Sequence, residues 1–237
     1  MIDWRDPAVT EQTECLLSIL VPTLESRRPL CDALQQDLER QISQSACDDE
    51  VEILLSCDNG QASIGAKRNQ LIRQARGRFV VFIDDDDRVS RHYVEKIIQA
   101  IRNDPDIDCV GFTGEITFRG KHPRKMQHSI NHREWQHGNG MYLRPPCHIT
   151  PIRREIAMRY SFAEVDFAED MDWTLRMSRD RALQREVILD DVLYFYRCRR
   201  SYVYQWLVDR TQTLRHALGL RYADGNRIRK KPVWRRR

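Results

Sequence analysis

Four short apolar runs, separated by three segments that can form amphipathic helices, constrain the fold of this chain more than any other feature. The apolar runs span residues 16–21, 51–56, 79–83 and 109–113. Their length and the turn residues that follow them predict buried strands. Residues 29–42, 64–75 and 90–101 place apolar side chains on one helical face, so they predict the intervening helices. This alternation is typical of an α/β fold with a mostly parallel, doubly wound sheet flanked by helices.

The second half of the chain has a weaker pattern. Residues 115–118 predict a short strand that pairs back on its predecessor, and residues 120–146 show no clear period. A stretch of that length without regular structure is usually functional or mobile. Helices are expected at residues 150–160, 168–179 and 202–218, and strands at 187–189 and 192–196. The length of 237 residues favours one large domain, with two small domains as the alternative.

Composition excludes several classes of protein. Hydrophobic residues make up 41% of the chain and charged residues 31%, as in an ordinary globular protein. No apolar run is long enough to cross a bilayer, and the acidic, polar N-terminus does not match a signal peptide. The seven cysteines include no C-x-x-C pair, which argues against a disulfide framework or a four-cysteine zinc site and for a reducing compartment. We therefore expect a cytoplasmic protein.

The net charge of +4 is unevenly distributed along the chain. The tail at residues 227–237 carries seven cations and no acid, which leaves residues 1–226 with a net charge of −3. A tail of this kind can bind nucleic acid or an anionic membrane surface, or it can be a solvated end.

Four consecutive aspartates, Asp84 to Asp87, follow the third apolar run. Like charges so close together repel one another, so a cation is expected to neutralise them. Oxygen ligands favour Mg²⁺ or Mn²⁺, and Mg²⁺ commonly links one or two carboxylates to substrate phosphates. An acidic turn before a helix is the alternative, but that role needs only one or two aspartates. The run therefore predicts a divalent metal site that holds a diphosphate.

Two other polar turns follow predicted strands, at residues 22–25 (Pro-Thr-Leu-Glu) and 57–60 (Cys-Asp-Asn-Gly). Ligands of doubly wound sheets bind beyond the carboxyl ends of the strands. The two turns and the aspartate run are therefore expected to form one binding edge.

These segments together resemble the family 2 glycosyltransferases, whose nucleotide-sugar domain has the GT-A fold. The resemblance rests on Ser-Ile-Leu-Val-Pro-Thr at residues 18–23, Ser-Cys-Asp-Asn-Gly at 56–60, Gly-Ala-Lys-Arg-Asn at 65–69, Gly-Arg-Phe at 77–79, Phe-Ile-Asp-Asp-Asp-Asp at 82–87, Phe-Ala-Glu-Asp-Met-Asp-Trp at 167–173 and Tyr-Phe-Tyr-Arg at 194–197. It covers residues 16 to 200. The resemblance implies a metal-dependent, inverting transfer from a nucleotide-diphosphate sugar to an acceptor hydroxyl.

The resemblance also implies how the chain is divided. The expected parts are an N-terminal extension at 1–14, a nucleotide-sugar-binding half at 15–114, an acceptor-binding and catalytic-base half at 115–200, a C-terminal helix at 201–226 and the basic tail at 227–237.

On the donor side, the resemblance assigns roles to the residues that match the family's motifs. Pro22, Thr23 and Glu25 would line the base and ribose pocket. Asp58 would hydrogen-bond the nucleobase, and Arg68 would approach the diphosphate.

For metal binding and catalysis, the resemblance points to five acidic residues. Asp84, Asp85 and Asp86 match the D-x-D region, with Asp86 as the foremost metal ligand and Asp84 beside it. Asp170 would be the general base that removes the acceptor's proton, and Glu169 would be its neighbour on the acceptor side. A positioned base contributes on the order of 10²–10⁴-fold to the rate. An acidic helix N-terminus is the alternative for this pair.

Some positions depart from the family pattern. Leu24 and Glu25 stand where an aromatic residue and Asn are usual, so the nucleobase stays unidentified. The Gln-x-x-Arg-Trp motif of processive enzymes is absent, which favours transfer of a single sugar.

The histidines allow more than one interpretation. His148 precedes a predicted helix and is either an extra metal ligand, as in some GT-A enzymes, or a packed or capping residue. His128 and His132 lie one helical turn apart, but no cysteine is placed to complete a usual zinc site. We expect acceptor contacts or plain surface for these two.

Basic and aromatic residues of the irregular segment, together with the tail, suit a polyanionic acceptor. Those in the segment are Arg119, Lys121, Arg124, Lys125, Arg133, Trp135 and Arg144. A modified base in DNA and a lipid- or polysaccharide-linked glycan both fit. A nucleotidyltransferase is one alternative function, although residues 22–29 lack the glycines of a phosphate loop. A non-catalytic nucleic-acid-binding relative is the other.

Overall fold

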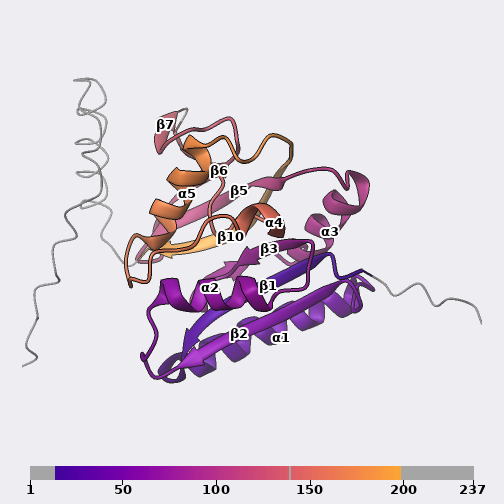
Figure 1. The fold of residues 1–237 in the computed structure, drawn as a ribbon, viewed down its shortest axis with the longest axis vertical. Coiled ribbons are helices and arrows are strands. Elements are labelled where there is room, and N and C mark those ends of the chain that lie inside the picture. The colour runs from indigo at the N-terminus through magenta and orange to yellow at the C-terminus, as the bar shows by residue number, and fades with distance from the viewer. Residues whose placement is uncertain (1–13, 139, 199–237) are drawn as a thin grey trace, which may run out of the picture.

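The computed structural model describes residues 14–138 and 140–198 (Figure 1). The helices are η1 (Glu25–Arg27), α1 (Arg28–Gln44), α2 (Ile64–Gln74), α3 (Tyr93–Asn103), α4 (Arg154–Ala157) and α5 (Glu169–Arg179). The strands are β1 (Leu17–Leu24), β2 (Val51–Asp58), β3 (Phe79–Phe82), β4 (Arg88–Val89), β5 (Cys109–Phe118), β6 (Lys121–His128), β7 (Gln136–Gly138), β8 (Met141–Arg144), β9 (Ile152–Arg153) and β10 (Glu186–Cys198). The predicted N-terminal extension, the C-terminal helix at 201–226 and the basic tail lie outside the described residues, except for Glu14.

All described strands belong to one mixed sheet. Its order is β2-β1-β3-β9-β5-β6-β8-β7, with β10 paired to β5 and β4 paired to β10. β1 is parallel to both β2 and β3, and β5 is parallel to β10 along most of its length. β1 is therefore flanked on both sides, and the strand order reverses there. Doubly wound folds bind ligands beyond the carboxyl ends of the strands at the point where the strand order reverses.

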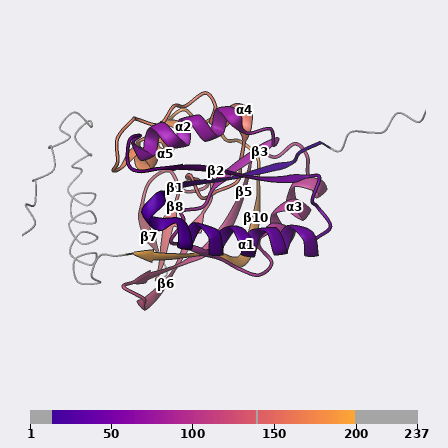
Figure 2. The ribbon, with the colours of Figure 1, turned by 90° about the horizontal axis from the view of Figure 1, so that it is seen from below.

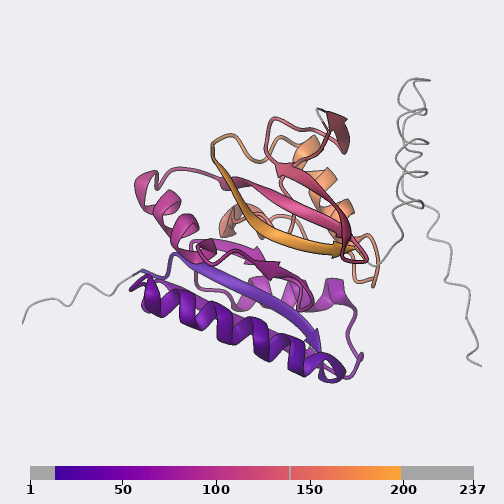
Figure 3. The same ribbon diagram turned by 180° about the vertical axis from the view of Figure 1, so that it is seen from behind.

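Helices cover the sheet on both faces. Figure 2 shows α2, α4 and α5 on one side of the sheet and α1 and α3 on the other. Figure 3, from behind, shows α1 lying along β1 and β2, with β5 and β10 running side by side above them. α1 connects β1 to β2, and α2 connects β2 to β3. Since α1 and α2 lie on opposite faces of the sheet, the two crossovers also use opposite faces (Figure 2).

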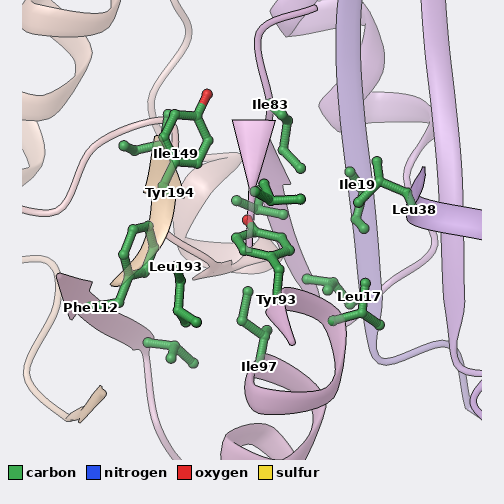
Figure 4. Close-up of a cluster of buried hydrophobic side chains, with 14 of the residues drawn as sticks. Leu17, Ile19, Leu38, Ile83, Tyr93, Ile97, Phe112, Ile149, Leu193 and Tyr194 are labelled. Atoms are coloured by element: carbon green, nitrogen blue, oxygen red, sulfur yellow. The ribbon is translucent and has the colours of Figure 1, made fainter. Parts of the chain in front are cut away.

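Each face has its own apolar core. The α1 and α3 face packs side chains from β1, β3, β5 and β10 around Tyr93 and Ile97 of α3 (Figure 4). The α2, α4 and α5 face packs Phe82, Phe162 and Trp173, with the rings of Phe162 and Trp173 stacked at 4.6 Å. Each fully buried Leu, Ile or Phe stabilises the fold by about 1.5–3 kcal/mol relative to an exposed one. These cores hold the carboxyl ends of the strands in place.

Local signals explain where several helices begin. Pro29 lies in the first turn of α1, where its missing N–H costs nothing. Ser63 caps α2, since its hydroxyl oxygen accepts a hydrogen bond from the backbone N–H of Ala66 over 3.2 Å. The helix predicted over residues 90–101 begins later than expected. α3 begins at Tyr93, whose N–H donates to the backbone carbonyl of Ser90.

The second half differs most from the sequence prediction. Residues 120–146 are not irregular, because they contain β6, β7 and β8. Residues 115–118 do not pair back but continue β5, to which β10 supplies a parallel partner. The expected strands at 187–189 and 192–196 are one strand, β10, with irregular register between Leu189 and Tyr194.

The helix expected at residues 150–160 is also mostly wrong. Ile152 instead pairs antiparallel with Val80 of β3 and with Cys109 of β5, and only the four residues of α4 are α-helical. Pro151 can open a helix locally. Here the bridge that β9 forms between two neighbouring strands outweighs that local preference.

Candidate active site

The aspartate run lies at the carboxyl end of β3, beside the carboxyl end of β1. Thr23 of β1 donates its hydroxyl hydrogen to Asp85 Oδ2 over 2.6 Å, which links the two strand ends. The four carboxylates do not share one partner. Asp84 contacts Arg68, Asp85 and Asp86 contact Arg27, and Asp87 accepts a hydrogen bond from Tyr194. Their mutual repulsion is therefore relieved by groups from three other parts of the chain.

Arg68 of α2 is the buried cation at the centre of the site. Its side chain is only 2% exposed, its Nη2 donates to Asp84 Oδ1 over 3.0 Å, and its Nη1 lies 2.9 Å from Glu169 Oε1. The guanidinium also lies over the rings of Phe82 and Phe162, at 5.4 and 5.6 Å from their centroids. A buried arginine is tolerated when carboxylates compensate its charge. Arg68 thus joins the aspartate run to the start of α5.

His148 makes a second link between these two regions. Its Nδ1 lies 3.2 Å from Asp170 Oδ2, and its Nε2 lies 3.8 Å from Asp84 Oδ2. Burial and the nearby Arg68 lower the pKa of His148, but the two carboxylates outweigh them and hold the pKa well above its usual value. Burial raises the pKa of Asp170, but His148 overcomes this and lowers it to about 2. Asp170 is therefore ionised at neutral pH.

An unusual backbone conformation places Glu169 and Asp170. Ala168 precedes α5 in the left-handed region, with φ 63° and ψ 14°. Non-glycine residues seldom adopt this conformation, and such positions concentrate at functional sites. The preceding loop is fixed by Asn69 of α2, which accepts a hydrogen bond from Phe162 N over 2.8 Å and donates one to Phe162 O over 2.9 Å. The loop before α5 is thereby tied to the helix that carries Arg68.

Lys67 holds the carboxyl ends of β1 and β2 together. Its ammonium group donates to the backbone carbonyl of Thr23 over 2.5 Å and pairs with Asp58. Asp58 also accepts hydrogen bonds from the N–H groups of Gly60 and Ala62, and the bond with Lys67 lowers its pKa to about 2. Asp58 therefore shapes the turn after β2 and keeps only part of its carboxylate for a ligand.

The other residues predicted to bind the nucleotide sugar lie at the same edge of the sheet. Pro22 is buried within β1, whereas Glu25 is exposed at the start of η1 and accepts a hydrogen bond from the Cys57 thiol over 3.2 Å. Leu24 pairs with Asp58 in the register of β1 and β2. The turns at residues 22–25 and 57–60 are thus neighbours, as the sequence predicted.

The predicted metal ligands are not gathered around one point. Asp84 is turned toward Arg68 and His148, and Asp86 lies 2.8 Å from Arg27 Nη2. Within residues 14–138 and 140–198, no three His, Cys, Asp or Glu side chains are arranged to hold an ion. The oxygen ligands still fit a hard divalent cation. Asp86 is a partly exposed carboxylate, and it already contacts a positive charge, that of Arg27.

β10 brings the second half of the chain to the aspartate run. Tyr194 donates its hydroxyl hydrogen to Asp87 Oδ2 over 2.8 Å and accepts a hydrogen bond from Asp84 N over 3.3 Å. Arg197 N donates to Asp87 Oδ1 over 3.2 Å. Burial, and then the charge of Asp84, raise the pKa of Asp87 to about 7. Asp87 therefore fastens β10 to the site and is not open to a ligand.

The structure brings together most of the residues that the sequence singled out. Arg68, Asp84, His148, Glu169 and Asp170 form one connected group, and Thr23 joins Asp85 next to it. Sequence reasoning missed Arg27, Lys67, Asn69 and Tyr194. Three of these four lie inside the quoted motifs, which was a usable signal. Arg27 had no such signal.

Known proteins resemble this chain in sequence and in fold. The sequence model of the family described as "Glycosyl transferase family 2" matches residues 19–162. A segment of 58 residues is 34% identical to EpsH of Bacillus subtilis (strain 168), and it spans 24% of this chain and 17% of EpsH. The matched family region ends before Glu169 and Asp170.

Two solved structures share the fold. Residues 1–349 of TarS from S. aureus, in complex with UDP, superimpose with a TM-score of 0.54 at 17% identity, over 77% of this chain and 60% of that one. Glucosyl-3-phosphoglycerate synthase from Mycobacterium tuberculosis, in complex with Mn²⁺, UDP-glucose and phosphoglyceric acid, gives a TM-score of 0.50 at 15% identity, over 93% and 88%. This chain therefore spans less than two thirds of EpsH and of the TarS fragment. The predicted α/β fold of GT-A type is confirmed.

None of the helices in residues 14–138 and 140–198 combines the length and the apolar character needed to cross a bilayer.

Proposed function

Since this chain belongs to glycosyl transferase family 2, we propose that it transfers one sugar from a nucleotide-diphosphate sugar to an acceptor hydroxyl, with inversion at the anomeric carbon and with the help of Mn²⁺ or Mg²⁺. The observation that carries the proposal is the connected group of Arg68, Asp84, His148 and Asp170. It joins the end of a β strand in the donor half, at residues 15–114, to the start of a helix in the acceptor half, at residues 115–200.

The nucleotide sugar would lie against the turns after β1 and β2. Pro22, Thr23 and Glu25 would face the base and ribose, and Asp58 would offer its remaining oxygen capacity to the base. Thr23 is held by both Lys67 and Asp85, so this edge is rigid before a ligand arrives. The TarS fragment, which shares the fold, was solved with UDP, and the synthase was solved with UDP-glucose and Mn²⁺. These complexes support a donor of the same class for this chain.

Asp86 and Asp84, with His148 as an additional candidate, would hold the metal. A bound divalent cation neutralises negative charge on the diphosphate as the sugar–phosphate bond breaks. Arg68 is too deeply buried to reach the donor directly. We assign it a positioning role, in which its guanidinium fixes the carboxylate of Asp84 and orients Glu169.

Asp170 would act as the general base. The acceptor oxygen attacks the anomeric carbon on the face opposite the diphosphate, its proton passes to an Asp170 oxygen, and the electron pair of the breaking bond leaves with the diphosphate. His148 holds one oxygen of Asp170, which orients the carboxylate but also makes it a weaker base. Proton transfer becomes favourable only as the new bond forms, because the attacking oxygen grows more acidic. Glu169 would lie beside it on the acceptor side.

We further propose that the acceptor is a polyanion bound by a cationic strip made of Arg119, Lys121, Arg124, Lys125 and Arg197. All five residues are exposed. β5, β6 and β10 are adjacent strands, and the turn at Gly120 lies beside the Arg197 guanidinium. Arg197 also donates its backbone N–H to Asp87, so the strip begins next to the aspartate run. The phosphodiester backbone of DNA fits this strip and the basic tail by charge.

We propose that the enzyme is cytoplasmic. The seven cysteines include no C-x-x-C pair, which favours a reducing compartment.

The decisive experiment is a thermal-shift panel of UDP, GDP, CDP and ADP sugars, each with Mn²⁺, Mg²⁺ or a chelator. A donor that binds raises the melting temperature by mass action, and the shift should disappear with chelator. Asp86→Ala should remove the metal-dependent shift. Asp170→Asn should keep the shift while transfer falls by on the order of 10²–10⁴-fold. Normal turnover by Asp170→Asn would refute the base assignment.

The same panel separates the competing functions. A non-catalytic binding relative would respond to an oligonucleotide and to none of the nucleotide sugars. For the polyanion surface, Lys125→Gln should weaken binding of a labelled single-stranded oligonucleotide and reduce its salt dependence, whereas Lys96→Gln on α3 should not. Equal effects of both variants would assign the binding to overall charge rather than to the cationic strip.

A further inference from the structure

Arg27 occupies an unusual place for a residue without a predicted role. It closes η1, directly after the strand that carries Thr23, and its Nη2 lies between the carboxylates of Asp85 and Asp86, 2.8 Å from Asp86 Oδ1. The Asp86 side chain is 30% exposed and that of Asp85 is 3% exposed. Arg27 therefore contacts the residue expected to be the foremost metal ligand.

The contact is close but poorly satisfied. Nε and Nη2 of Arg27 are buried and form no hydrogen bond of acceptable geometry within residues 14–138 and 140–198. Arginine binds most strongly when its planar fork donates two parallel hydrogen bonds to a carboxylate or a phosphate. Nη2 thus forms ion pairs with both carboxylates, but the guanidinium does not donate the two parallel hydrogen bonds of which its fork is capable, so a phosphate or carboxylate of suitable geometry would bind it better.

We propose that Arg27 exchanges partners during the catalytic cycle: it neutralises Asp85 and Asp86 until the divalent metal binds Asp86, and it then donates to the diphosphate of the donor. The inference rests on the proposed function, because it assigns Arg27 a place in metal and donor binding. A divalent cation at Asp86 would lie close to the Arg27 guanidinium, and the repulsion between the two positive charges favours movement of the guanidinium away from Asp86. The displaced fork remains at the rim between the turn after β1 and the aspartate run, where the diphosphate would lie.

The proposal predicts opposite effects on two ligands. Arg27→Gln removes the competitor for Asp86, so Mn²⁺ alone should bind about three- to tenfold more tightly than to the wild type. The same variant lacks the fork that would bind the diphosphate, so the donor nucleotide should bind more weakly in saturating Mn²⁺, by about tenfold. A variant that was merely damaged would lose affinity for both ligands.

The test is a calorimetric titration of the full chain, first with Mn²⁺ and then, in saturating Mn²⁺, with whichever of UDP, GDP, CDP and ADP the wild type binds. Arg28→Gln is the matched control, because Arg28 is the next residue, carries the same charge and interacts with Asp32 and Cys57 rather than with Asp85 or Asp86. It should behave like the wild type. Arg27→Lys keeps the charge but not the fork, and should leave Mn²⁺ affinity near the wild-type value while weakening the nucleotide.

Each result has a definite meaning. Tighter Mn²⁺ binding together with weaker nucleotide binding, seen in Arg27→Gln and not in Arg28→Gln, supports the exchange. Unchanged or weaker Mn²⁺ binding by Arg27→Gln overturns it, and so does unchanged nucleotide affinity, while the proposed function stands in both cases. If the wild type and Arg27→Gln both fail to bind Mn²⁺ alone, the exchange is overturned; if neither binds Mn²⁺ when the nucleotide is present, the metal-dependent function is refuted as well.

Discussion

Replacing Gly65 with alanine tests how tightly the two halves of the site are packed together. Gly65 lies in the first turn of α2, and its N–H donates to the carbonyl of Val165 over 3.3 Å. A Cβ at this position would lie 1.9 Å from the backbone oxygen of Ala163 and 2.9 Å from its carbonyl carbon. Normal contact requires the helix and the loop to separate by about 1 Å or more. The loop leads directly into Glu169 and Asp170.

The expected cost follows from two opposing effects. Alanine is a better helix former than glycine by about 1 kcal/mol in a helix interior, and less than that gain is expected in the first turn. Overpacking against backbone costs about 1–3 kcal/mol, and a contact as short as this one belongs at the upper end. The net loss is about 2 kcal/mol, which corresponds to a decrease in Tm of roughly 4–8 °C for a chain of this size.

Urea unfolding followed by circular dichroism measures the stability, and transfer assays measure the displacement of Asp170. We expect Gly65→Ala to lose transfer activity beyond what its unfolded fraction explains, because a shift of about 1 Å at a catalytic group can cost on the order of 10²-fold. Gln70→Ala, on the exposed face of the same helix, is the control and should be close to neutral. If Gly65→Ala were as stable and as active as the wild type, the close approach of α2 to the loop would be refuted.

Two further substitutions test local parts of the fold. Glu52, a largely buried carboxylate, accepts hydrogen bonds from Ser18 and Arg76; burial raises its pKa, but these bonds outweigh burial and lower the pKa below its usual value. Its contribution is therefore present above the ordinary glutamate pKa and lost as the pH falls through the lowered one. Glu52→Gln should cost about 1–2 kcal/mol at pH 7, and urea melts should show the gap to the wild type closing in acid. Ser63→Ala removes the hydroxyl that accepts the Ala66 N–H at the start of α2 and should cost about 1 kcal/mol in the same melts; no loss would mean that the cap contributes nothing.

How much of the site the sequence could predict depends on how local each interaction is. The aspartate run, Arg68 and the Glu169–Asp170 pair stand out as short motifs, and the structure places them in one group. The pairing of His148 with Asp170 joins residues from separate segments, and the contact of Arg27 with Asp86 joins a turn after β1 to a turn after β3. No spacing rule connects such pairs, because the sheet brings them together.

The sequence alone determined the α/β alternation, the strands β1, β2, β3 and β5, and the three long helices between them. Those elements follow from apolar periodicity and from turn and cap residues, whose effects act over a few positions. Only the tertiary structure determined the secondary structure of residues 120–146 and of Ile152. Their local patterns are weak or favour a helix, and they become strands because neighbouring strands supply the backbone hydrogen-bond partners. The free energy of that pairing comes from residues far away along the chain, so it leaves no local signature in the sequence.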